Sequence, residues 1–461
     1  MPTHDLVVRG GLCVTAAGTS RTDIGIRRGR VAQIGGEMAG AREIDAASYL
    51  VLPGGVDVHV HLTNPPGRAS QQGPAWVDDL TTGSSAALAG GITTLGNMTF
   101  LGDGELPLAG LAREALLVRE QAIADFILHP VFREPTPAAL DQIPLLRERG
   151  HTTIKFFMST PTFDRYAPVF LEATARAGEA GLMTMIHCED YAIIDRATRT
   201  LVASGRGSLR HYADSRPIVS EVVATERAVA LAAATGAPVY VVHLSSAGSL
   251  DACRRGQAAG LPVYVETRPL YLYLTRERFD EPDGAKYVGQ PPLREAGDVA
   301  ALWAGLAQGS VHTVCSDHAP WSLAAKLDPT LSVAELRPGV ENLETQLPLL
   351  YSEGVRAGRI SLERFVEVTS TNAAKLFGLY PQKGCLAVGS DADLVLFDPE
   401  QTRTIGAPQH SRCDYSAFAG REVTGWPVMT LRRGEVAFDR GRITAAPGTG
   451  RLLSGGHVRA L

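Results

Sequence analysis

The middle of the chain alternates between short apolar runs and longer stretches in which apolar residues recur with helical spacing. The apolar runs predict strands at 49–58, 92–97, 125–130, 152–157, 182–187, 238–243, 262–266 and 311–316. The longer stretches predict helices at 77–89, 108–122, 136–148, 169–180, 220–235, 249–259, 298–308 and 361–377. Runs that are apolar throughout indicate strands buried on both faces, as in a parallel sheet. The pattern therefore predicts an α/β protein with a (β/α)8 TIM barrel.

Both ends of the chain have a different pattern, in which apolar and polar residues alternate and glycines recur. Alternating runs lie at 6–9, 12–15, 24–27 and 30–34, and again at 388–397, 428–432 and 435–438. We therefore expect one small β-sandwich module built from both termini, with its parts at 1–52 and 381–440 around a barrel at 53–380. The remaining tail, 441–461, is rich in glycine, and we expect it to be flexible or draped on a neighbouring chain.

The composition is that of an ordinary globular protein. Hydrophobic residues make up 45% and charged residues 20% of 461 positions, which is ample for a large core. With a formal net charge of -5 and no basic block, we expect no nucleic-acid partner. No apolar run approaches the roughly 18 residues of a membrane span, so we expect a cytoplasmic protein without membrane contact. Six scattered cysteines are expected to be reduced thiols.

Residues that can bind a metal follow the predicted strands at their carboxyl ends. Asp57, His59 and His61 share one side of the first barrel strand, and two imidazoles two residues apart can grip one ion. Further candidates on later strands are Lys155 on the fourth, His187 at the end of the fifth, His243 at the end of the sixth and Asp317 after the eighth. Catalytic residues of such barrels lie at the carboxyl ends of the strands, so we expect these side chains to meet.

Each candidate also has a plainer interpretation. His187 and His243 are alternatively strand-end histidines bonded to backbone, and Asp317 is alternatively the N-cap of a turn. Lys155 is alternatively a side chain that reaches water or pairs with a carboxylate. Two histidine endings on successive strands of one barrel favour ligands. A cation is a poor neighbour for metal-binding histidines, but carbon dioxide converts lysine into a carbamate, an anionic oxygen donor that can bridge two ions.

Four histidine nitrogens, one carbamate and one carboxylate are too many for a single four-coordinate zinc with an open position. The set suits two divalent ions. Imidazole and carboxylate ligands favour zinc, with manganese, cobalt and iron as alternatives. His318, beside Asp317, is expected either to support a ligand or to touch substrate.

With these residues in view, the chain resembles the amidohydrolase superfamily, specifically its branch of hydantoinases, dihydropyrimidinases, allantoinases and dihydroorotases. The motifs that carry the resemblance are Pro53-Gly-Gly-Val-Asp-Val-His-Val-His61, Ala89-Gly-Gly-Ile-Thr-Thr94, Ile154-Lys-Phe-Phe-Met158, Ile186-His-Cys-Glu189, Val242-His-Leu-Ser-Ser246, Pro291-Pro-Leu-Arg294, Ser316-Asp-His-Ala-Pro320 and Gly389-Ser-Asp-Ala-Asp393. They span nearly the whole chain and occur in the family's order.

The resemblance implies a binuclear metal centre and a hydrolytic reaction. His59 and His61 would bind the more buried ion, His187 and His243 the other, carbamylated Lys155 would bridge them, and Asp317 would ligate the first ion and shuttle protons. A metal-bridging hydroxide would open a cyclic amide, a hydantoin or dihydropyrimidine-like ring. A homotetramer or homodimer is implied as well.

The residues expected to contact substrate depart from the usual pattern of this branch. Hydantoinases and dihydropyrimidinases usually carry tyrosine where this chain has Thr160 and serine where it has Gln290. A backbone contact carries over to Gly339. Dihydroorotases usually carry arginine at the position of Thr63. Dihydroorotase activity is therefore among the least favoured of the possible activities. The alternatives are an allantoinase, another cyclic imide or lactam hydrolase, or, least favoured, a non-catalytic scaffold of the same fold.

Three apolar residues, Leu62, Phe157 and Trp321, are candidates for the wall of a substrate pocket, with plain core residues as the alternative. The loop at 63–76 is rich in proline, glycine and glutamine. It is expected to be either a lid over the site or a solvated loop.

Overall fold

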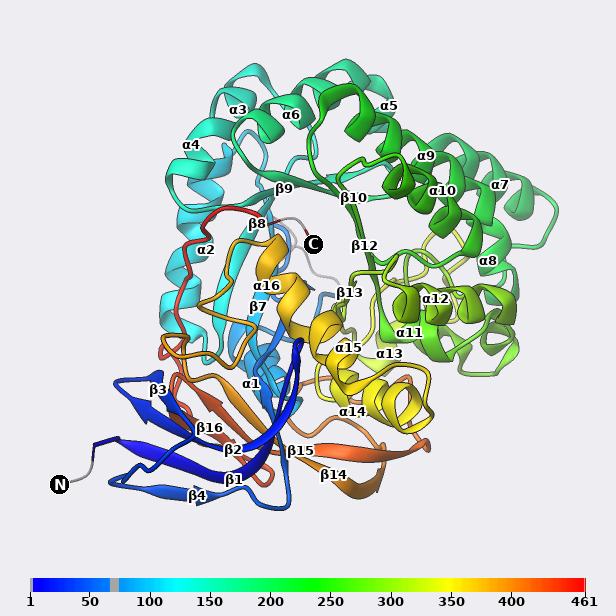
Figure 1. The fold of residues 1–461 in the computed structure, drawn as a ribbon. Helices are drawn as coiled ribbons and strands as arrows, with labels where there is room; N and C mark the ends of the chain where they lie inside the picture. Colours follow the sequence, from blue (N-terminus) through cyan, green and yellow to red (C-terminus); the bar gives the residue numbers. More distant parts are fainter. Residues whose placement is uncertain (1–2, 67–73, 460) are drawn as a thin grey trace.

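The computed structural model describes residues 3–66, 74–459 and 461, and its centre is a parallel sheet of eight strands (Figure 1). The strands are β6 (Gly55–Val60), β7 (Ile92–Phe100), β8 (Asp125–Val131), β9 (Thr153–Phe157), β10 (Met183–His187), β11 (Val239–Val241), β12 (Val263–Thr267) and β13 (Thr313–Val314). Each pairs with the next in sequence order, from β6 to β13. All eight strands overlap the predicted ranges, although several have different bounds.

The first and last strands of this sheet meet across a looser seam. Val60 and His318 form an isolated parallel bridge, and the backbone N–H of His61 donates to the carbonyl O of His318 at 2.8 Å. The backbone N–H of Ser316 donates to Oδ2 of Asp57 at 2.9 Å. These contacts join the segment after β13 to β6, so the sheet is a nearly closed barrel.

Helices surround the barrel (Figure 1). The longer ones are α1 (Leu80–Ala89), α2 (Pro107–Gln121), α6 (Ala167–Glu179), α7 (Tyr191–Ala203), α9 (Ile218–Thr235), α10 (Ala247–Ala258) and α12 (Ala296–Gln308). The shorter ones are α3 (Pro137–Asp141), α4 (Ile143–Glu148), α5 (Pro161–Arg165), α8 (Tyr212–Ser215), α11 (Pro269–Tyr273), α13 (Leu323–Lys326), α14 (Gln346–Leu350), α15 (Leu362–Val366) and α16 (Asn372–Leu376). The helix predicted at 136–148 is divided into α3 and α4, because Pro144 has no N–H to continue a helix.

A second sheet is built from both ends of the chain. Its strands are β1 (Leu6–Thr15), β2 (Gly18–Arg27), β3 (Arg30–Ile34), β4 (Glu43–Asp45), β5 (Leu50–Pro53), β14 (Leu394–Thr404), β15 (Glu422–Arg432), β16 (Glu435–Asp439) and β17 (Arg442–Ile443). The two parts join where β5 and β14 pair antiparallel. Apolar residues of both parts, such as Ile26 and Leu431, share a separate core. The predicted fold class is confirmed, and the division at residues 52, 380 and 440 stays a prediction.

The strand predicted at 49–58 is two strands that belong to different sheets. Leu50–Pro53 (β5) pairs with β1 and β14 in the β-sandwich module, whereas Gly55–Val60 (β6) begins the barrel. Gly54 lies between them, and a Cβ at this position would be 2.2 Å from Oγ1 of Thr93. The chain changes sheets at a place where it passes too close to β7 for any residue except glycine.

The tail packs on its own chain. After β17 it runs beside the start of β8, where the N–H of Phe126 donates to the O of Arg451 and the N–H of Leu453 donates to the O of Phe126, both at 2.7 Å. The tail thus covers the amino-terminal ends of barrel strands, and the C-terminus lies in front of the barrel in Figure 1. The expectation of a flexible tail is wrong, because backbone groups at the start of β8 form hydrogen bonds with it.

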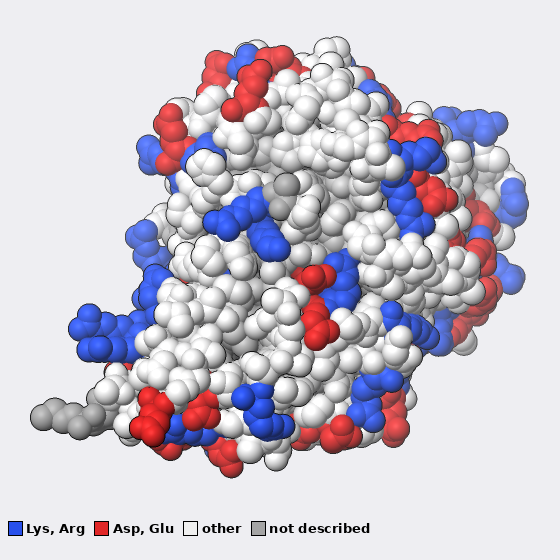
Figure 2. All heavy atoms as spheres, in the orientation of Figure 1, with Lys and Arg blue, Asp and Glu red and all other residues white. Residues whose placement is uncertain are grey.

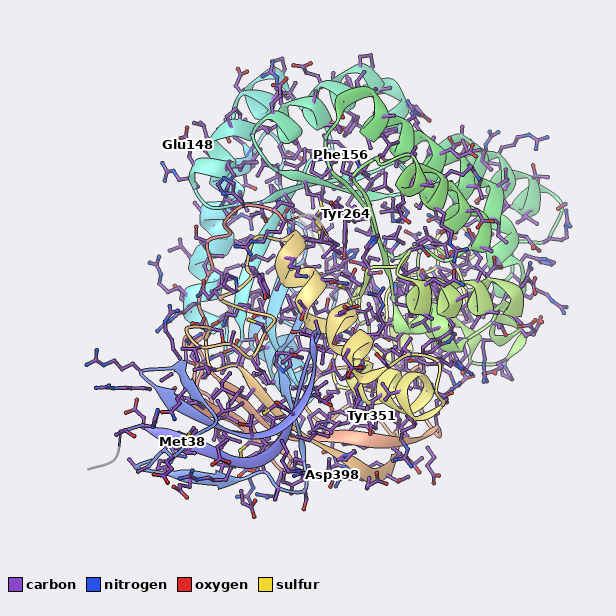
Figure 3. The ribbon with its side chains drawn as sticks, viewed as in Figure 1. Met38, Glu148, Phe156, Tyr264, Tyr351 and Asp398 are labelled. Atoms are coloured by element: carbon purple, nitrogen blue, oxygen red, sulfur yellow. The ribbon has the colours of Figure 1, made fainter. Side chains whose placement is uncertain are left out.

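Side chains of the barrel strands alternate between inside and outside. On β9, Phe156 faces outward, and its ring centroid lies 4.8 Å from that of Phe170 on α6. Tyr264 of β12 lies within the ring of strands, in a core cluster with Val56 and Met98 (Figure 3). Lys155, next to Phe156, therefore faces the inside of the barrel.

The face in Figure 2 carries lysine and arginine side chains interspersed with aspartate and glutamate. Within residues 3–66, 74–459 and 461, no helix combines the length and the hydropathy needed to cross a membrane.

Candidate metal centre

His59 and His61 at the end of β6 and Asp317 after β13 bring their polar atoms together. Nε2 of His61 lies 3.1 Å and Nε2 of His59 lies 3.4 Å from Oδ1 of Asp317. One ligand atom from each of the three residues lies within 4.8 Å of the others, and all three residues are buried. The three side chains can hold one metal ion between them.

His187 of β10 and His243 after β11 form a second pair. Nδ1 of His187 lies 3.0 Å from Nε2 of His243, and both rings are buried. The ring of His243 is stacked on that of His59 with centroids 5.4 Å apart, so the second pair adjoins the first group. The four histidines predicted from strand ends therefore meet in one place.

Lys155 is on β9, which pairs with β10, the strand of His187. Its side chain is fully buried, and its Nζ has no hydrogen-bond partner among the residues that the structure describes. Burial lowers the pKa of Lys155 to about 8. Burial also lowers the pKa values of His61, His187 and His243, and the charge of Lys155 contributes in each case. Lys155 is thus close to both groups.

The distances between the histidine and aspartate atoms fit metal ligands. Two zinc ligands with bonds of roughly 2.0–2.1 Å in tetrahedral geometry lie roughly 3.3 Å apart. The contacts of 3.0 Å between His187 and His243 and 3.4 Å between His59 and Asp317 are close to this separation. Zinc is held in proteins by imidazole nitrogens and carboxylate oxygens such as these.

The protonation states suit metal binding as well. Burial lowers the pKa of His61 to about 4 and lowers those of His187 and His243, so these rings are neutral at pH 7 and keep a lone pair. Burial raises the pKa of Asp317, but Arg268 and His59 outweigh it and hold that pKa well below its ordinary value of 3.8. Asp317 is therefore an anion at neutral pH.

Two of these residues have unusual backbone conformations. The φ angle is 38° at His243 and 48° at Asp317, in the left-handed region that residues with a Cβ rarely adopt. The strands β11 and β13 end two and three residues before them, earlier than predicted. Such local strain is common at functional sites, where the surrounding structure holds a side chain in place.

Glu266, at the end of β12, supports the centre and was not among the predicted site residues. Its Oε1 lies 2.7 Å from Nδ1 of His59 and accepts from the backbone N–H of His243 at 2.9 Å. Its Oε2 accepts from the hydroxyl of Tyr240 at 3.0 Å. The same rule of strand ends that identified the histidines also applies to Glu266.

Glu189 supports one candidate ligand through its side chain, and His318 contacts another through its backbone. Nε2 of His187 lies 2.9 Å from Oε2 of Glu189, which also accepts from Arg216. His318, expected to support a ligand or touch substrate, directs its Nε2 to Oδ2 of Asp78 at 2.8 Å. Its backbone, rather than its ring, contacts the centre through His61.

The residues expected to contact substrate lie in loops near the centre. The Oγ1 of Thr160 donates to the O of Phe157, whose ring centroid lies 5.5 Å from that of His187. Gly339 has a φ of 117°, and its N–H donates to the O of Val288 at 3.0 Å. Because Val288 precedes Gln290 by two residues, the loops of Gly339 and Gln290 are adjacent.

An aromatic cluster adjoins the histidines. The ring of Trp76 lies 5.0 Å and that of Phe100 lies 5.8 Å from the ring of His61. Phe157 lies 6.2 Å from Phe100, and Trp321 lies 6.4 Å from Trp76. Two predicted wall residues, Phe157 and Trp321, thus belong to this cluster, whereas Trp76 and Phe100 were not predicted.

Leu62 is a core residue instead. Its side chain is 2% exposed and fills the space beside Gly83 of α1, where a Cβ would be 2.2 Å from Cδ2 of Leu62. Of the loop at 63–76, expected to be a lid or a solvated loop, the part 67–73 lies outside the described residues.

Comparisons with known proteins agree with this site. A family model described as "Amidohydrolase family" matches residues 50–437. The chain is 37% identical over 455 residues to a D-hydantoinase of Ralstonia pickettii, covering 97% of this chain and 98% of that protein. It is 38% identical over 459 residues to a D-phenylhydantoinase of Escherichia coli O1:K1, covering 97% of each. The crystal structure of a D-hydantoinase from Bacillus sp. AR9 has a TM-score of 0.94 and 36% identity, covering 99% of this chain and 100% of that one.

The chain belongs to the amidohydrolase family. This confirms the resemblance inferred from the sequence motifs, and it makes the protein a hydrolase of carbon–nitrogen bonds.

Proposed function

We propose that this amidohydrolase opens the ring of a small cyclic amide of the hydantoin or dihydropyrimidine kind. The observation that carries the proposal is the meeting of two ligand groups, His59 with His61 and His187 with His243. The buried Lys155 is on the strand next to that of His187. Such a set suits two divalent ions better than one. Relatives that match along the whole chain and are named D-hydantoinase and D-phenylhydantoinase support the same class of ring.

Within this proposal Lys155 would be carbamylated by carbon dioxide and would supply an oxygen ligand to both ions, with zinc the favoured metal. The ligands would be His59, His61 and Asp317 for one ion and His187 and His243 for the other. A carbamate removes the positive charge of a buried lysine that lacks a hydrogen-bond partner in the described part of the chain. The lowered pKa of Lys155 favours the neutral amine, which is the form that reacts with carbon dioxide.

Ions held by these ligands would polarise the amide carbonyl and lower the pKa of an attacking water. The contribution of Asp317 is proton transfer. Its Oδ1 is directed to His59 and His61, and its carboxyl is ionised at neutral pH. Asp317 therefore takes a proton from the attacking water as a general base and returns it to the leaving ring nitrogen as a general acid.

The ring would lie between the loops of Thr160, Gln290 and Gly339. The aromatic cluster of Trp76, Phe100, Phe157 and Trp321 supplies apolar surface next to His61 and His187. Aromatic faces suit a flat ring or an apolar substituent on it. The absence of the usual tyrosine at Thr160 leaves the amide oxygen to be bound by other groups, and Gln290 offers both a donor and an acceptor.

The experiment combines metal content with substrate choice. Protein purified without added metal is analysed for bound metal, and hydrolysis of hydantoin, dihydrouracil, allantoin and dihydroorotate is measured. About two ions per chain and rapid opening of at least one ring are expected. Cleavage of only linear N-acyl amino acids or esters would overturn the ring assignment. No bound metal after incubation with zinc and bicarbonate would favour the scaffold alternative.

We further infer that the enzyme is a cytoplasmic homodimer or homotetramer. All six cysteines are free thiols, as expected in a reducing compartment. Val202 of α7 and Val219 and Val223 of α9 are exposed on neighbouring helices, and a second copy would bury them. Light scattering at several concentrations measures the mass, and a monomer at all of them would contradict the inference.

A further inference from the structure

Arg268 is a fully buried arginine at the edge of the metal centre. It follows β12 directly and is the N-cap residue of α11, and its relative exposure is 0%. Its Nη1 donates to Oδ2 of Asp317, on the side of the carboxylate away from His61. Its guanidinium carbon lies 5.4 Å from the centre of the Tyr271 ring.

The two other nitrogen donors of this guanidinium form no hydrogen bond with the described residues. Neither Nε nor Nη2 of Arg268 has a hydrogen-bond partner within residues 3–66, 74–459 and 461, although both atoms are buried. A buried charged group with unpaired donors is unfavourable unless a ligand or water satisfies it. The Nε and Nη2 hydrogens point in parallel, and this fork matches the two oxygens of a carboxylate.

The guanidinium of Arg268 lies beside the loop that contains Gln290, a residue expected to contact substrate. A Cβ on Gly289 would lie 3.4 Å from Nη1 and 3.5 Å from Nη2 of Arg268, so the guanidinium lies against the backbone immediately before Gln290. Lys326, a buried cation beside the same loop, already donates to the carbonyl oxygens of Val288, Arg337 and Gly339. Of these two cations beside the loop of Gly289, Arg268 is therefore the one with unpaired donors among the described residues.

We propose that Arg268 binds an anionic group of the substrate, so that the preferred ring is a cyclic amide carrying a carboxylate substituent. The inference rests on the proposed ring-opening function and narrows its substrate class. Thr63, at the position where a carboxylate-binding arginine was considered from the sequence, is uncharged and its Oγ1 accepts from Asn97 at 3.0 Å. Arg268 comes from another strand and approaches the centre from the side of Asp317.

The test compares two rings that differ in one group. Hydantoin-5-acetic acid and hydantoin-5-acetamide have nearly the same shape, but only the acid carries a carboxylate. Their ring-opened products, N-carbamoyl-aspartate and N-carbamoyl-asparagine, share the carboxylate that ring opening creates and differ only in the side-chain group. Calorimetric binding of the two to metal-loaded protein therefore tests the side-chain carboxylate without turnover. We expect the acid of each pair to be favoured by about 10- to 100-fold, in kcat/KM for the rings and in Kd for the products.

Variants assign the preference to the side chain. Arg268→Met keeps the length of the side chain without the charge, and we expect it to remove the preference by weakening the acid far more than the amide. Arg268→Lys keeps the charge without the fork and should retain only part of the preference. The control is Arg254→Gln, because Arg254 pairs with Ser310 and Gln308 at the surface. If Arg268→Met fails to fold, the acid-to-amide ratios of the wild type and of Arg268→Lys still test whether Arg268 binds the carboxylate.

A ratio near one in the wild type, or an unchanged ratio in Arg268→Met, would overturn the inference and leave water as the partner of the free donors. If the protein opens the ring of the amide but shows either of these acid-to-amide ratios, the proposed function remains intact. Failure of the protein to bind metal, to open any ring and to bind either product would instead remove the proposed function and this inference with it.

Discussion

Glu266 fixes the orientation of His59, because its Oε1 lies 2.7 Å from Nδ1 of the imidazole and both side chains are buried. With Nδ1 as the donor to Glu266, the lone pair of His59 is on Nε2, which faces Asp317 at 3.4 Å. The same carboxylate oxygen accepts a hydrogen bond from the backbone N–H of His243 at 2.9 Å. A single side chain of β12 therefore positions a residue from each of the two ligand groups.

The first prediction concerns this carboxylate. Glu266→Gln keeps the size of the side chain but weakens its bond to His59, so we expect metal affinity to fall by about 10- to 100-fold. Competition with a chelator measures the affinity. Glu172→Gln, at an exposed position of α6, is the matched control and should bind metal as the wild type does. Unchanged affinity in Glu266→Gln would contradict a supporting role.

The second prediction concerns proton transfer by Asp317. Asp317→Asn keeps an oxygen near His61 but can neither accept nor return the proton, so kcat should fall by about 100- to 10,000-fold. Metal analysis of the same protein separates lost chemistry from lost metal. Asp141→Asn, in an exposed position on α3, serves as control. A variant that retains the wild-type rate would rule out the assigned role.

The third prediction concerns the bridging lysine. Lys155→Ala should lose metal and activity, because the proposed carbamate, which would hold both ions, cannot form. Short carboxylic acids or bicarbonate should restore part of the activity by supplying the missing oxygen ligands in the space that the side chain leaves. Activity is measured with and without the additive over a range of concentrations. Full activity of Lys155→Ala without an additive would disprove the bridge.

The fourth prediction concerns pH and the metal-free protein. The pKa of His61 is about 4 in the folded state against 6.5 for an ordinary histidine, so between these values the unfolded chain binds more protons than the folded one. The free energy of unfolding should therefore decrease as pH falls from about 6.5 towards 4, by roughly 3 kcal/mol from this group. His187 and His243 act in the same direction.

Urea unfolding of chelator-treated protein at several pH values between 7.5 and 4.5 measures this dependence. His61→Asn lacks the titrating ring and should show a smaller loss over the same interval. Equal slopes in the two proteins would show that the ring of His61 does not resist protonation in the folded state.

Substrate recognition was less predictable from the sequence than the ligand set. Thr160, Gln290 and Gly339 were expected from the positions that they occupy in the family's motifs. Trp76 and Phe100 were not expected, because the sequence does not show whether an aromatic side chain faces the core or a functional site. Arg268 follows the strand predicted at 262–266, but its unpaired donors become visible only when all neighbouring side chains are in place.

The sequence by itself determined the barrel, the β-sandwich module of both termini and the strand ends that carry His59, His61, Lys155, His187, His243 and Asp317. These features depend on local periodicity and on the rule that parallel strands end at one edge, so residue order was sufficient. The tertiary structure decided the change of sheet at Gly54, the packing of the tail on β8, the support of His59 by Glu266 and the free fork of Arg268. Each of these depends on contacts between residues far apart in the chain, where the burial and pairing of one side chain are set by another strand.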